Sequence, residues 1–188
     1  MSVEATKKEI IELLKSVDRD GMEKLIDFLE RTDFFKAPAS TKFHNNFEGG
    51  LAEHSLNVYK SLKELTNGQW ADETLIIVGL LHDICKVNNY KVEMRNKKDP
   101  DTGNWYQEPY YTTEDMMPLG HGEKSVMLIQ EFIKLTKEEL YSIRWHMGGY
   151  EPKENYNYIS NAYYKYPLAA YTHMADIKAT YIYETIKK

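Results

Sequence analysis

Apolar residues recur at helical spacing over most of the chain. Over residues 2–31 they stand three and four positions apart with a break at 20–21, which predicts two short amphipathic helices. The residues that carry this pattern are Ile10, Leu13, Leu14, Val17, Met22, Leu25, Ile26 and Leu29. A segment rich in Pro, Asn and Gly, residues 34–50, predicts a loop that leads into a helix over about residues 51–65.

The segment of residues 72–85 is apolar on almost all sides, which predicts a helix buried at the centre of the fold with Asp72 as its N-cap. Between residues 87 and 111 the pattern changes to alternation around the turn sequence Asp99–Gly103. This predicts a small β-hairpin inserted among helices. A further helix is expected over about residues 122–134.

Helix signals return in the C-terminal third. Thr136 and Glu139 form the sequence of a capping box, which predicts a helix over about residues 137–146. The Tyr-rich and Asn-rich residues 150–166 predict a loop, and Pro167 is placed as the first residue of a last helix. The pattern as a whole predicts an all-α helical bundle with one inserted hairpin.

Length and composition fit one packed domain. A chain of 188 residues with 42% hydrophobic residues is long enough to bury one core, and nothing in it marks a second. We divide this single domain, residues 1–188, into N-terminal helices over 1–35, a helical core over 43–183 and the hairpin insertion over 87–111.

Charge and cysteine content argue against several classes of protein. A net charge of −5 disfavours the basic surface that holds duplex nucleic acid. The single cysteine, Cys85, excludes an internal disulfide, and the first 15 residues lack the apolar run of a signal peptide. No apolar stretch reaches the length of a membrane span. We therefore expect a cytoplasmic protein that contacts neither membranes nor duplex nucleic acid.

Polar residues with metal-binding side chains fall where helices are otherwise apolar. His54 lies near the start of one predicted helix, His82 and Asp83 end the apolar one, and Asp176 lies inside the last. Burying these groups is unfavourable unless they are hydrogen-bonded, paired or bound to a cation. Taken singly, each histidine fits a hydrogen-bonded core residue better. Taken together, the set favours a shared divalent metal.

These residues stand in motifs that resemble the H…HD…D signature of HD-domain phosphohydrolases. The motifs are Gly49-Gly50-Leu51-Ala52-Glu53-His54-Ser55, Gly79-Leu80-Leu81-His82-Asp83-Ile84-Cys85-Lys86 and Ala175-Asp176. The resemblance covers roughly residues 43–183 and implies a helical bundle in which His54, His82, Asp83 and Asp176 hold a metal.

Two further histidines, His121 and His146, match the order seen in the family's two-metal subgroup. In that arrangement Asp83 bridges the cations. The HD half of bacterial 3′-to-5′ exoribonucleases is the nearest likeness, although their oligonucleotide-binding domain has no counterpart in this sequence.

The expected chemistry is phosphate ester hydrolysis. Two divalent cations outweigh two ligand carboxylates in charge, so the site attracts an anionic phosphate. The resemblance implies a phosphohydrolase that cleaves phosphomonoesters or phosphodiesters of nucleotides or related small phosphates with metal-activated hydroxide, with Asp83 and Lys86 as catalytic residues. Histidine-rich ligation favours one or two ions of Mn, Fe, Co, Ni or Zn, with Mg acceptable in one site.

Three basic side chains are expected to bind the substrate phosphate, those of Lys86, Lys124 and Arg144. Surface roles are an equal alternative for each. His44 and His173 are not expected to be direct ligands, although His173 shares a helix face with Asp176.

The remaining candidates are Cys85 and the tyrosines. Cys85 is expected to be a small buried residue facing away from the metal ligands. The tyrosines that flank the site can stack a nucleobase, or form semi-buried covers and oligomer contacts; they are Tyr90, Tyr106, Tyr110, Tyr111, Tyr150, Tyr156 and Tyr158.

Two alternatives to hydrolysis remain at this stage: an HD-type di-iron oxygenase, and a nucleotide-binding sensor or decoy that keeps the HD fold without turnover. The sequence gives no argument for an oligomeric state.

Overall fold

The computed structural model describes residues 2–184 and is mostly helical, with a two-stranded antiparallel hairpin. The helices are α1 (Val3–Lys15), α2 (Met22–Arg31), α3 (Gly50–Thr66), α4 (Asp72–Leu81), α5 (His121–Gln130), α6 (Lys137–Arg144), α7 (Tyr156–Lys165) and α8 (Leu168–Lys178), and the strands are β1 (Tyr90–Lys98) and β2 (Trp105–Thr113). The predicted all-α class is therefore too strict, because the hairpin contributes two strands of nine residues.

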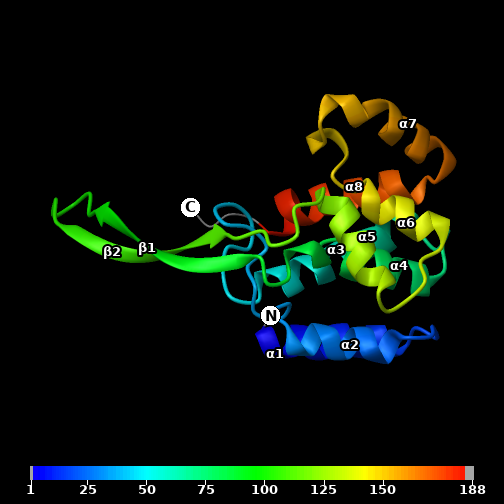
Figure 1. The fold of residues 1–188 in the computed structure, drawn as a ribbon, viewed down its shortest axis with the longest axis horizontal. Helices are drawn as coiled ribbons and strands as arrows, with labels where there is room; N and C mark the ends of the chain where they lie inside the picture. The colour runs from blue at the N-terminus through cyan, green and yellow to red at the C-terminus, as the bar shows by residue number, and fades with distance from the viewer. Residues whose placement is uncertain (1, 185–188) are drawn as a thin grey trace.

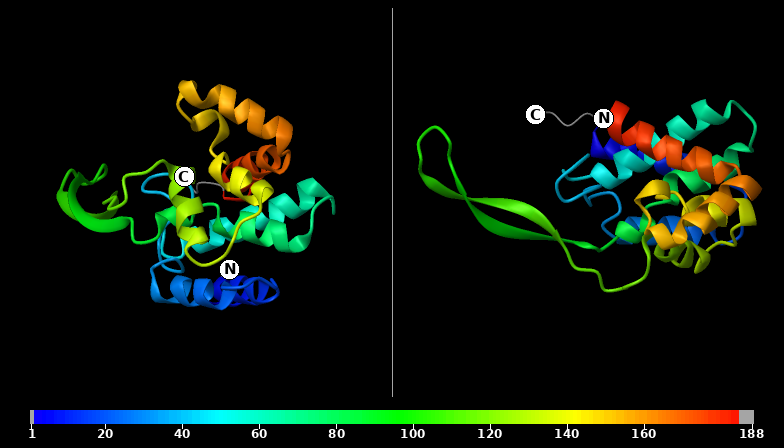
Figure 2. Two further views of the ribbon diagram at one scale, coloured as in Figure 1. Left: turned by 45° about the vertical axis from the view of Figure 1, so that its right-hand side comes forward. Right: turned by 90° about the horizontal axis from the view of Figure 1, so that it is seen from above.

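The helices form a body from which the hairpin reaches away (Figure 1). Helices α1 and α2 lie along one side of this body and α7 lies on the opposite side, and Figure 2 shows the same separation after rotation. No helix among residues 2–184 combines the length and the apolar character that crossing a bilayer requires.

Helix α4 is the centre of the core, as the sequence predicts. Every residue from Leu75 to Leu81 is buried, and the surrounding core cluster draws on α1, α2, α3, α5, α6 and α8. Helix α3 packs closely on α4 at Gly79, where an added Cβ would lie 2.5 Å from the Cα of Tyr59. Only a residue without a side chain permits this approach, which brings α3 and its histidine beside the end of α4.

The start of α4 differs from the prediction. Ala71 is the N-cap and Asp72 is the first helical residue. The Asp72 carboxylate accepts hydrogen bonds from the Tyr59 hydroxyl at 3.1 Å and from Lys63 Nζ at 2.9 Å. The Asp72 carboxylate is therefore bound by side chains of α3 and does not accept hydrogen bonds from backbone N–H groups at the start of α4, as an N-cap side chain would.

The capping box at α6 is confirmed. The backbone N–H of Glu139 donates to Thr136 Oγ1 at 3.2 Å, and the backbone N–H of Thr136 donates to Glu139 Oε2 at 2.8 Å. The fully buried Glu139 carboxylate also accepts hydrogen bonds from Arg19 at 2.7 Å and from Thr74 Oγ1 at 3.2 Å. A charge that is costly to bury is thereby paired, and it ties the loop before α2 to α4 and α6.

The hairpin lies where alternation predicts it, with Tyr90 opposite Thr113 and Lys98 opposite Trp105. Because residues opposite one another share a face, the hairpin is amphipathic. One face carries the exposed apolar residues Val92, Met94 and Trp105, and the other carries ion pairs such as that of Arg95 with Glu108.

Helix α7 occupies a segment that the sequence predicts as loop. Its apolar face consists of Ile159 and Ala162, buried beside Trp145, with the partly buried Tyr163 next to them. Tyr166, just after the helix, stacks on a tyrosine of α6 with ring centroids 4.5 Å apart. Positions 159, 162, 163 and 166 have helical spacing, but tyrosines supply half of the pattern, which is why the sequence predicts a loop here.

The contact at Gly79 generates a stability prediction. Gly79→Ala should lower the free energy of unfolding by about 1–3 kcal/mol, because the new methyl group overpacks the interface with Tyr59. Urea denaturation followed by circular dichroism measures this loss. Gly149→Ala is the matched control, since a Cβ there meets no atom within 4 Å. Equal stabilities of the two variants would contradict the assigned contact.

Candidate metal centre

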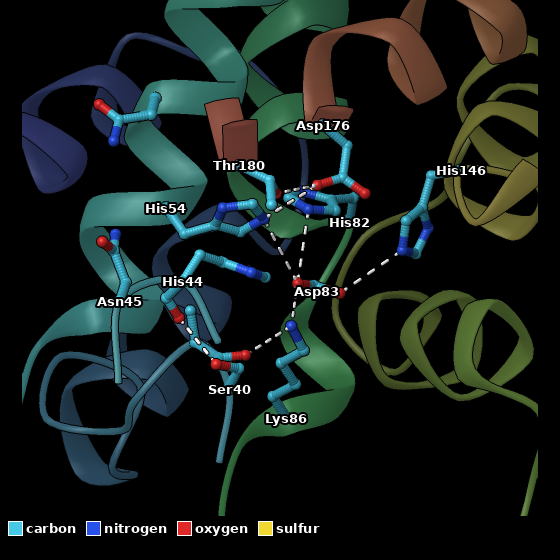
Figure 3. Close-up of polar contacts among 12 residues, drawn as sticks. Ser40, His44, Asn45, His54, His82, Asp83, Lys86, His146, Asp176 and Thr180 are labelled. Atoms are coloured by element: carbon cyan, nitrogen blue, oxygen red, sulfur yellow. Dashed lines mark hydrogen bonds and ion pairs between the residues drawn. The ribbon is translucent and has the colours of Figure 1, made fainter. Parts of the chain in front are cut away.

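Side chains from separate segments converge beside the C-terminal end of α4 (Figure 3). The structure brings together all of the residues predicted as metal ligands. They are His54 on α3, His82 and Asp83 after α4, His121 at the start of α5, His146 after α6 and Asp176 on α8.

The carboxylate of Asp83 lies at the centre of this group and is 3% exposed. Its Oδ1 faces His121 Nε2 at 2.6 Å and His146 Nε2 at 3.5 Å. Its Oδ2 faces His82 Nε2 at 3.6 Å and His54 Nε2 at 3.7 Å. The two oxygens thus point to two different pairs of imidazoles, which is the arrangement that a bridging ligand needs.

His82 and His146 are oriented by the ends of their own helices. His82 Nδ1 lies 2.9 Å from the carbonyl of Gly79, and His146 Nδ1 lies 2.6 Å from the carbonyl of Ile143. Because a carbonyl only accepts, each Nδ1 carries the hydrogen, and in the neutral ring each Nε2 presents a lone pair. Burial lowers the pKa of His146, but the attraction of Asp83 and the charge of Asp176 outweigh burial and raise the pKa in the absence of a metal. Both Nε2 atoms are buried without a hydrogen-bond partner among the described residues. Two buried lone pairs without donors fit a metal cation.

His54 is held between two carboxylates. Its Nε2 lies 3.3 Å from Asp176 Oδ1, and its Nδ1 lies 3.0 Å from Glu184 Oε2. Asn57 Nδ2 donates to Glu184 Oε1 at 2.9 Å and orients this carboxylate. Burial lowers the pKa of His54, but hydrogen bonds and charge from Asp176 and Glu184 outweigh it and raise the pKa to about 10. In the metal-free protein the imidazole is therefore protonated on both nitrogens and positively charged at neutral pH.

The other members of the site differ in charge. Burial raises the pKa of Asp83, but the charge of Lys86 and the interactions with His82 and His121 together outweigh burial and hold the pKa well below its usual range. Burial also raises the pKa of Asp176, but the hydrogen bond and charge of His54 together with the charges of His82 and His146 outweigh burial and lower the pKa. Burial lowers the pKa of His82 to about 3, which keeps this imidazole neutral. Two carboxylates and a neutral imidazole are the ionisation states that metal ligation requires.

Lys86 reaches back over Asp83 from the following turn. Its Nζ lies 2.6 Å from Asp83 Oδ2 and donates to the carbonyl of Ala39 at 2.8 Å. Burial lowers its pKa, but the charge and hydrogen bond of Asp83 together with Tyr90 outweigh burial and raise the pKa, so the ammonium stays charged. The Tyr90 hydroxyl donates to the same carbonyl at 3.1 Å. Lys86 is therefore a fixed positive charge beside the imidazoles.

The ligand atoms are close enough to share cations. Three sets of three have all their ligand atoms within 4.8 Å of one another and consist of predicted ligands alone. These sets are His54, His82 and Asp83; His82, His146 and Asp176; and Asp83, His121 and His146. Mixed imidazole and carboxylate donors at this spacing fit divalent transition metals.

A cavity of about 750 Å³ opens onto the site. Its floor includes His54, Asp83, Lys86, His121 and Asp176. A smaller cavity of about 270 Å³ adjoins it and shares Lys86 and His121. Four of the six metal-ligand candidates, His54, Asp83, His121 and Asp176, therefore line a space that a small molecule can enter.

Lys124 and Arg144, predicted to bind phosphate, differ in placement. Lys124 lines the smaller cavity and pairs with Asp115 at 2.6 Å. Arg144 pairs with Glu151 at 2.9 Å, and its guanidinium lies 3.6 Å from the ring centroid of Trp145. It lines neither cavity of the site. A phosphate contact by Arg144 stays a prediction that this placement does not support.

Two residues next to the ligands have contacts that the sequence did not reveal. His173 Nδ1 donates to the carbonyl of His146 at 2.7 Å, so it supports a ligand segment from α8. The Cys85 thiol is buried as expected, and burial raises its pKa to about 12. It does not face away from the site, however, because its Sγ lies 3.4 Å from His121 Nδ1. The chain leaves helical geometry at Asp83, which turns Cys85 toward α5.

Sequence reasoning missed Glu184 and left His44 outside the ligand set. Glu184 and His44 form a further cluster with His54, with all ligand atoms within 4.8 Å. On a regular α-helix, residues about seven apart share a face, but a π-helical turn at Ala179–Tyr183 adds a residue and brings Glu184 onto the face of Asp176. A π-helical turn leaves no sequence signal that would have identified Glu184.

Comparisons with known proteins agree with this geometry. The HD domain family model matches residues 51–184. The chain is also similar to a protein of Methanocaldococcus jannaschii named dihydroneopterin 2′,3′-cyclic phosphate phosphodiesterase, with 34% identity over 103 residues, which are 44% of this chain and 41% of the relative. The chain thus matches less than half of that relative's length. No solved structure matches the chain.

The family match covers more than half of the chain and includes every predicted metal ligand. The likeness to bacterial 3′-to-5′ exoribonucleases is not shown by these matches and stays a prediction. The HD motif, the helical body and the convergence of imidazoles on Asp83 agree with the family match, and this chain belongs to the HD domain family.

Proposed function

We propose that this protein is a metal-dependent phosphohydrolase that acts on small phosphate esters. One observation carries the proposal: the buried Nε2 atoms of His82 and His146 have no hydrogen-bond partner among residues 2–184 and lie 3.6 and 3.5 Å from the oxygens of Asp83. Leaving two imidazole lone pairs buried and unsatisfied costs free energy that a cation recovers. The ligands of the cation are the clustered imidazoles and carboxylates described above.

The site accommodates one or two divalent ions. His121 and His146 would hold one ion, His54, His82 and Asp176 would hold the other, and Asp83, which faces both groups of imidazoles, would contribute to both sites. Imidazole-rich ligation favours Mn, Fe, Co, Ni or Zn, and Mg suits one position at most. When bound, such ions supply Lewis-acid chemistry, because they stabilise charge on phosphate oxygens and lower the pKa of bound water.

The chain's own groups orient the substrate around these ligands. The Lys86 ammonium is fixed by Asp83 and the Ala39 carbonyl, and it lines the cavity. It can therefore bind a phosphate oxygen without reorganising. The Glu184 carboxylate holds His54 through Nδ1 and leaves Nε2 directed at Asp83 and Asp176.

The relative named above supports a phosphodiester as the bond cleaved, and specifically a 2′,3′-cyclic phosphate. We therefore propose cyclic phosphodiesters of nucleotide-like compounds as the first substrates to test. The cavity size supports this choice, because about 750 Å³ holds a nucleotide-sized molecule.

Removal of the metal should abolish activity. After dialysis against EDTA we expect no hydrolysis of adenosine 2′,3′-cyclic phosphate, and Mn²⁺ should restore it. Asp83→Asn should lower kcat/KM by at least about 100-fold, beyond the 10–100-fold typical of residues that only support a ligand. Asp101→Asn, in the exposed hairpin turn, is the control. Tight binding of nucleotides by the Mn-loaded protein, without turnover of any in a broad panel, would instead identify a sensor.

Glu184 generates a further prediction, because its carboxylate holds Nδ1 of the candidate ligand His54. Glu184→Gln should weaken Mn²⁺ binding by roughly 10–100-fold, as loss of a carboxylate behind a ligating histidine typically does. Calorimetry on the metal-free protein measures the affinity, with Glu131→Gln on the surface as the matched control. An unchanged affinity with an unchanged circular dichroism spectrum would contradict the assignment.

The raised pKa of His54 predicts how the free energy of unfolding of the metal-free protein depends on pH. Because the pKa is about 10 in the folded protein and 6.5 in the unfolded chain, this group stabilises the fold fully below pH 6.5. Its contribution is lost as the pH rises through about 10. Urea denaturation in EDTA should therefore show a steeper loss of stability between these values for the wild type than for His54→Gln. Parallel curves would show that His54 does not carry this proton.

A further inference from the structure

The outer wall of the large cavity is aromatic and apolar. Phe43, Tyr150 and Tyr181 line it, although 69%, 63% and 64% of their respective surfaces are exposed. Met147 and Ile177 complete this surface, which we call the aromatic wall. Exposed rings gathered on one concave surface are unusual, because burial in the core does not explain them.

Tyr150 and Tyr181 are fixed relative to each other. Their hydroxyl oxygens lie 3.2 Å apart in a hydrogen bond that joins the turn Gly148–Tyr150 to the π-helical turn after α8. The hydroxyls are thereby satisfied and the ring surfaces remain free. Paired rings in fixed positions bind a flat partner with little loss of side-chain entropy.

The turn that carries Tyr150 is tied to the metal ligands. Gly148 has a φ of +50° and lies against the ring of His173, where an added Cβ would meet ring atoms at 2.5 Å. His173 in turn holds the carbonyl of His146 at 2.7 Å. Tyr150 and the candidate ligand His146 therefore lie on one short segment that His173 holds in place, so the fold sets where the Tyr150 ring stands relative to the site.

The aromatic wall carries no charge. Among residues 2–184, Lys86 is the only lysine or arginine that lines this cavity, and it lies on the floor beside Asp83. Lys42 and Arg95 line a different cavity, of about 480 Å³, at the hairpin. Polyphosphates and nucleic acid strands need several cations along their length. The cavity therefore suits one phosphate on the floor and a neutral group against the wall.

On these grounds we propose that the substrate is a single-phosphate ester whose alcohol carries a flat heteroaromatic ring, and that Tyr150 and Tyr181 bind this ring. The inference rests on the proposed function for the position of the phosphate and for nucleotide-like substrates, and it adds the residues that recognise the ring. It selects against sugar phosphates, polyphosphates and oligonucleotides.

The test separates ring recognition from turnover by measuring binding of a nonhydrolysable pair. The first ligand is the adenosine phosphonate in which CH₂ replaces the 5′ ester oxygen, and the second is methylphosphonate, its ring-free counterpart. With Mn-loaded protein under anaerobic conditions, calorimetry should show tighter binding of the adenosine compound. Tyr150→Ala and Tyr181→Ala should each weaken it by roughly 5–100-fold, the range for one base–aromatic stack.

Two controls keep the result specific. Tyr150→Phe and Tyr181→Phe keep the rings and should retain most of the affinity. Tyr164→Ala removes a tyrosine that is 88% exposed on α7, outside the cavity, and should change nothing. Methylphosphonate binding should stay within about twofold in all variants, because the phosphate site is untouched.

The outcomes distinguish the two proposals. Equal wild-type affinity for both phosphonates, or equal loss of both in the alanine variants, would overturn the role of the aromatic wall. Enzyme kinetics provide a second measurement. Tyr150→Ala and Tyr181→Ala should raise KM for adenosine 2′,3′-cyclic phosphate and leave kcat unchanged. If the wild type binds the adenosine phosphonate through these tyrosines but hydrolyses no ester, the ring proposal stands and the hydrolase proposal fails.

Discussion

The rest of the structure depends on one buried negative charge, the carboxylate of Asp83. A lone carboxylate at 3% exposure is strongly unfavourable, and the fold surrounds it with imidazoles on both oxygens and with the ammonium of Lys86. Lys86 balances that charge while the remaining lone pairs stay free. The buried charge is therefore paired by the chain's own side chains, and the same side chains form the clusters that could hold a metal. This combination explains why α3, α5, α6 and α8 all end or begin around the same point.

Helix ends supply much of the orientation. The last turn of a helix leaves carbonyl groups without intrahelical donors. In α4 and α6 those carbonyls belong to Gly79 and Ile143, and His82 and His146 satisfy them through Nδ1. One hydrogen bond thus finishes the helix and also directs Nε2 into the site. Because the same hydrogen bond ends the helix and orients the histidine, a substitution that disrupts either helix end is expected to affect both the stability of the fold and the geometry of the site.

Much of this was readable in the sequence, for a physical reason. His82 and Asp83 follow an apolar run, and polar groups in such a place need partners, which identified the centre. The buried helix, the hairpin and the capping box at Thr136 follow from periodicity and local hydrogen bonds. Glu184 and Tyr181 were missed because a π-helical turn changes the spacing, and α7 was missed because tyrosines carry its apolar face. Arg144 shows that charge alone does not place a side chain at a site.

The order of the ligands along the chain has a consequence for biosynthesis. A polypeptide grows from its N-terminus, and early segments fold before late ones are made. His54, His82, Asp83, His121 and His146 therefore emerge before Asp176 and the carboxylate of Glu184 that steadies His54. In a nascent chain, His54 is therefore made long before Asp176 and Glu184, the two carboxylates that hold its ring nitrogens. The full set of clustered imidazoles and carboxylates assembles only after α8 and the π-helical turn that follows it have been translated.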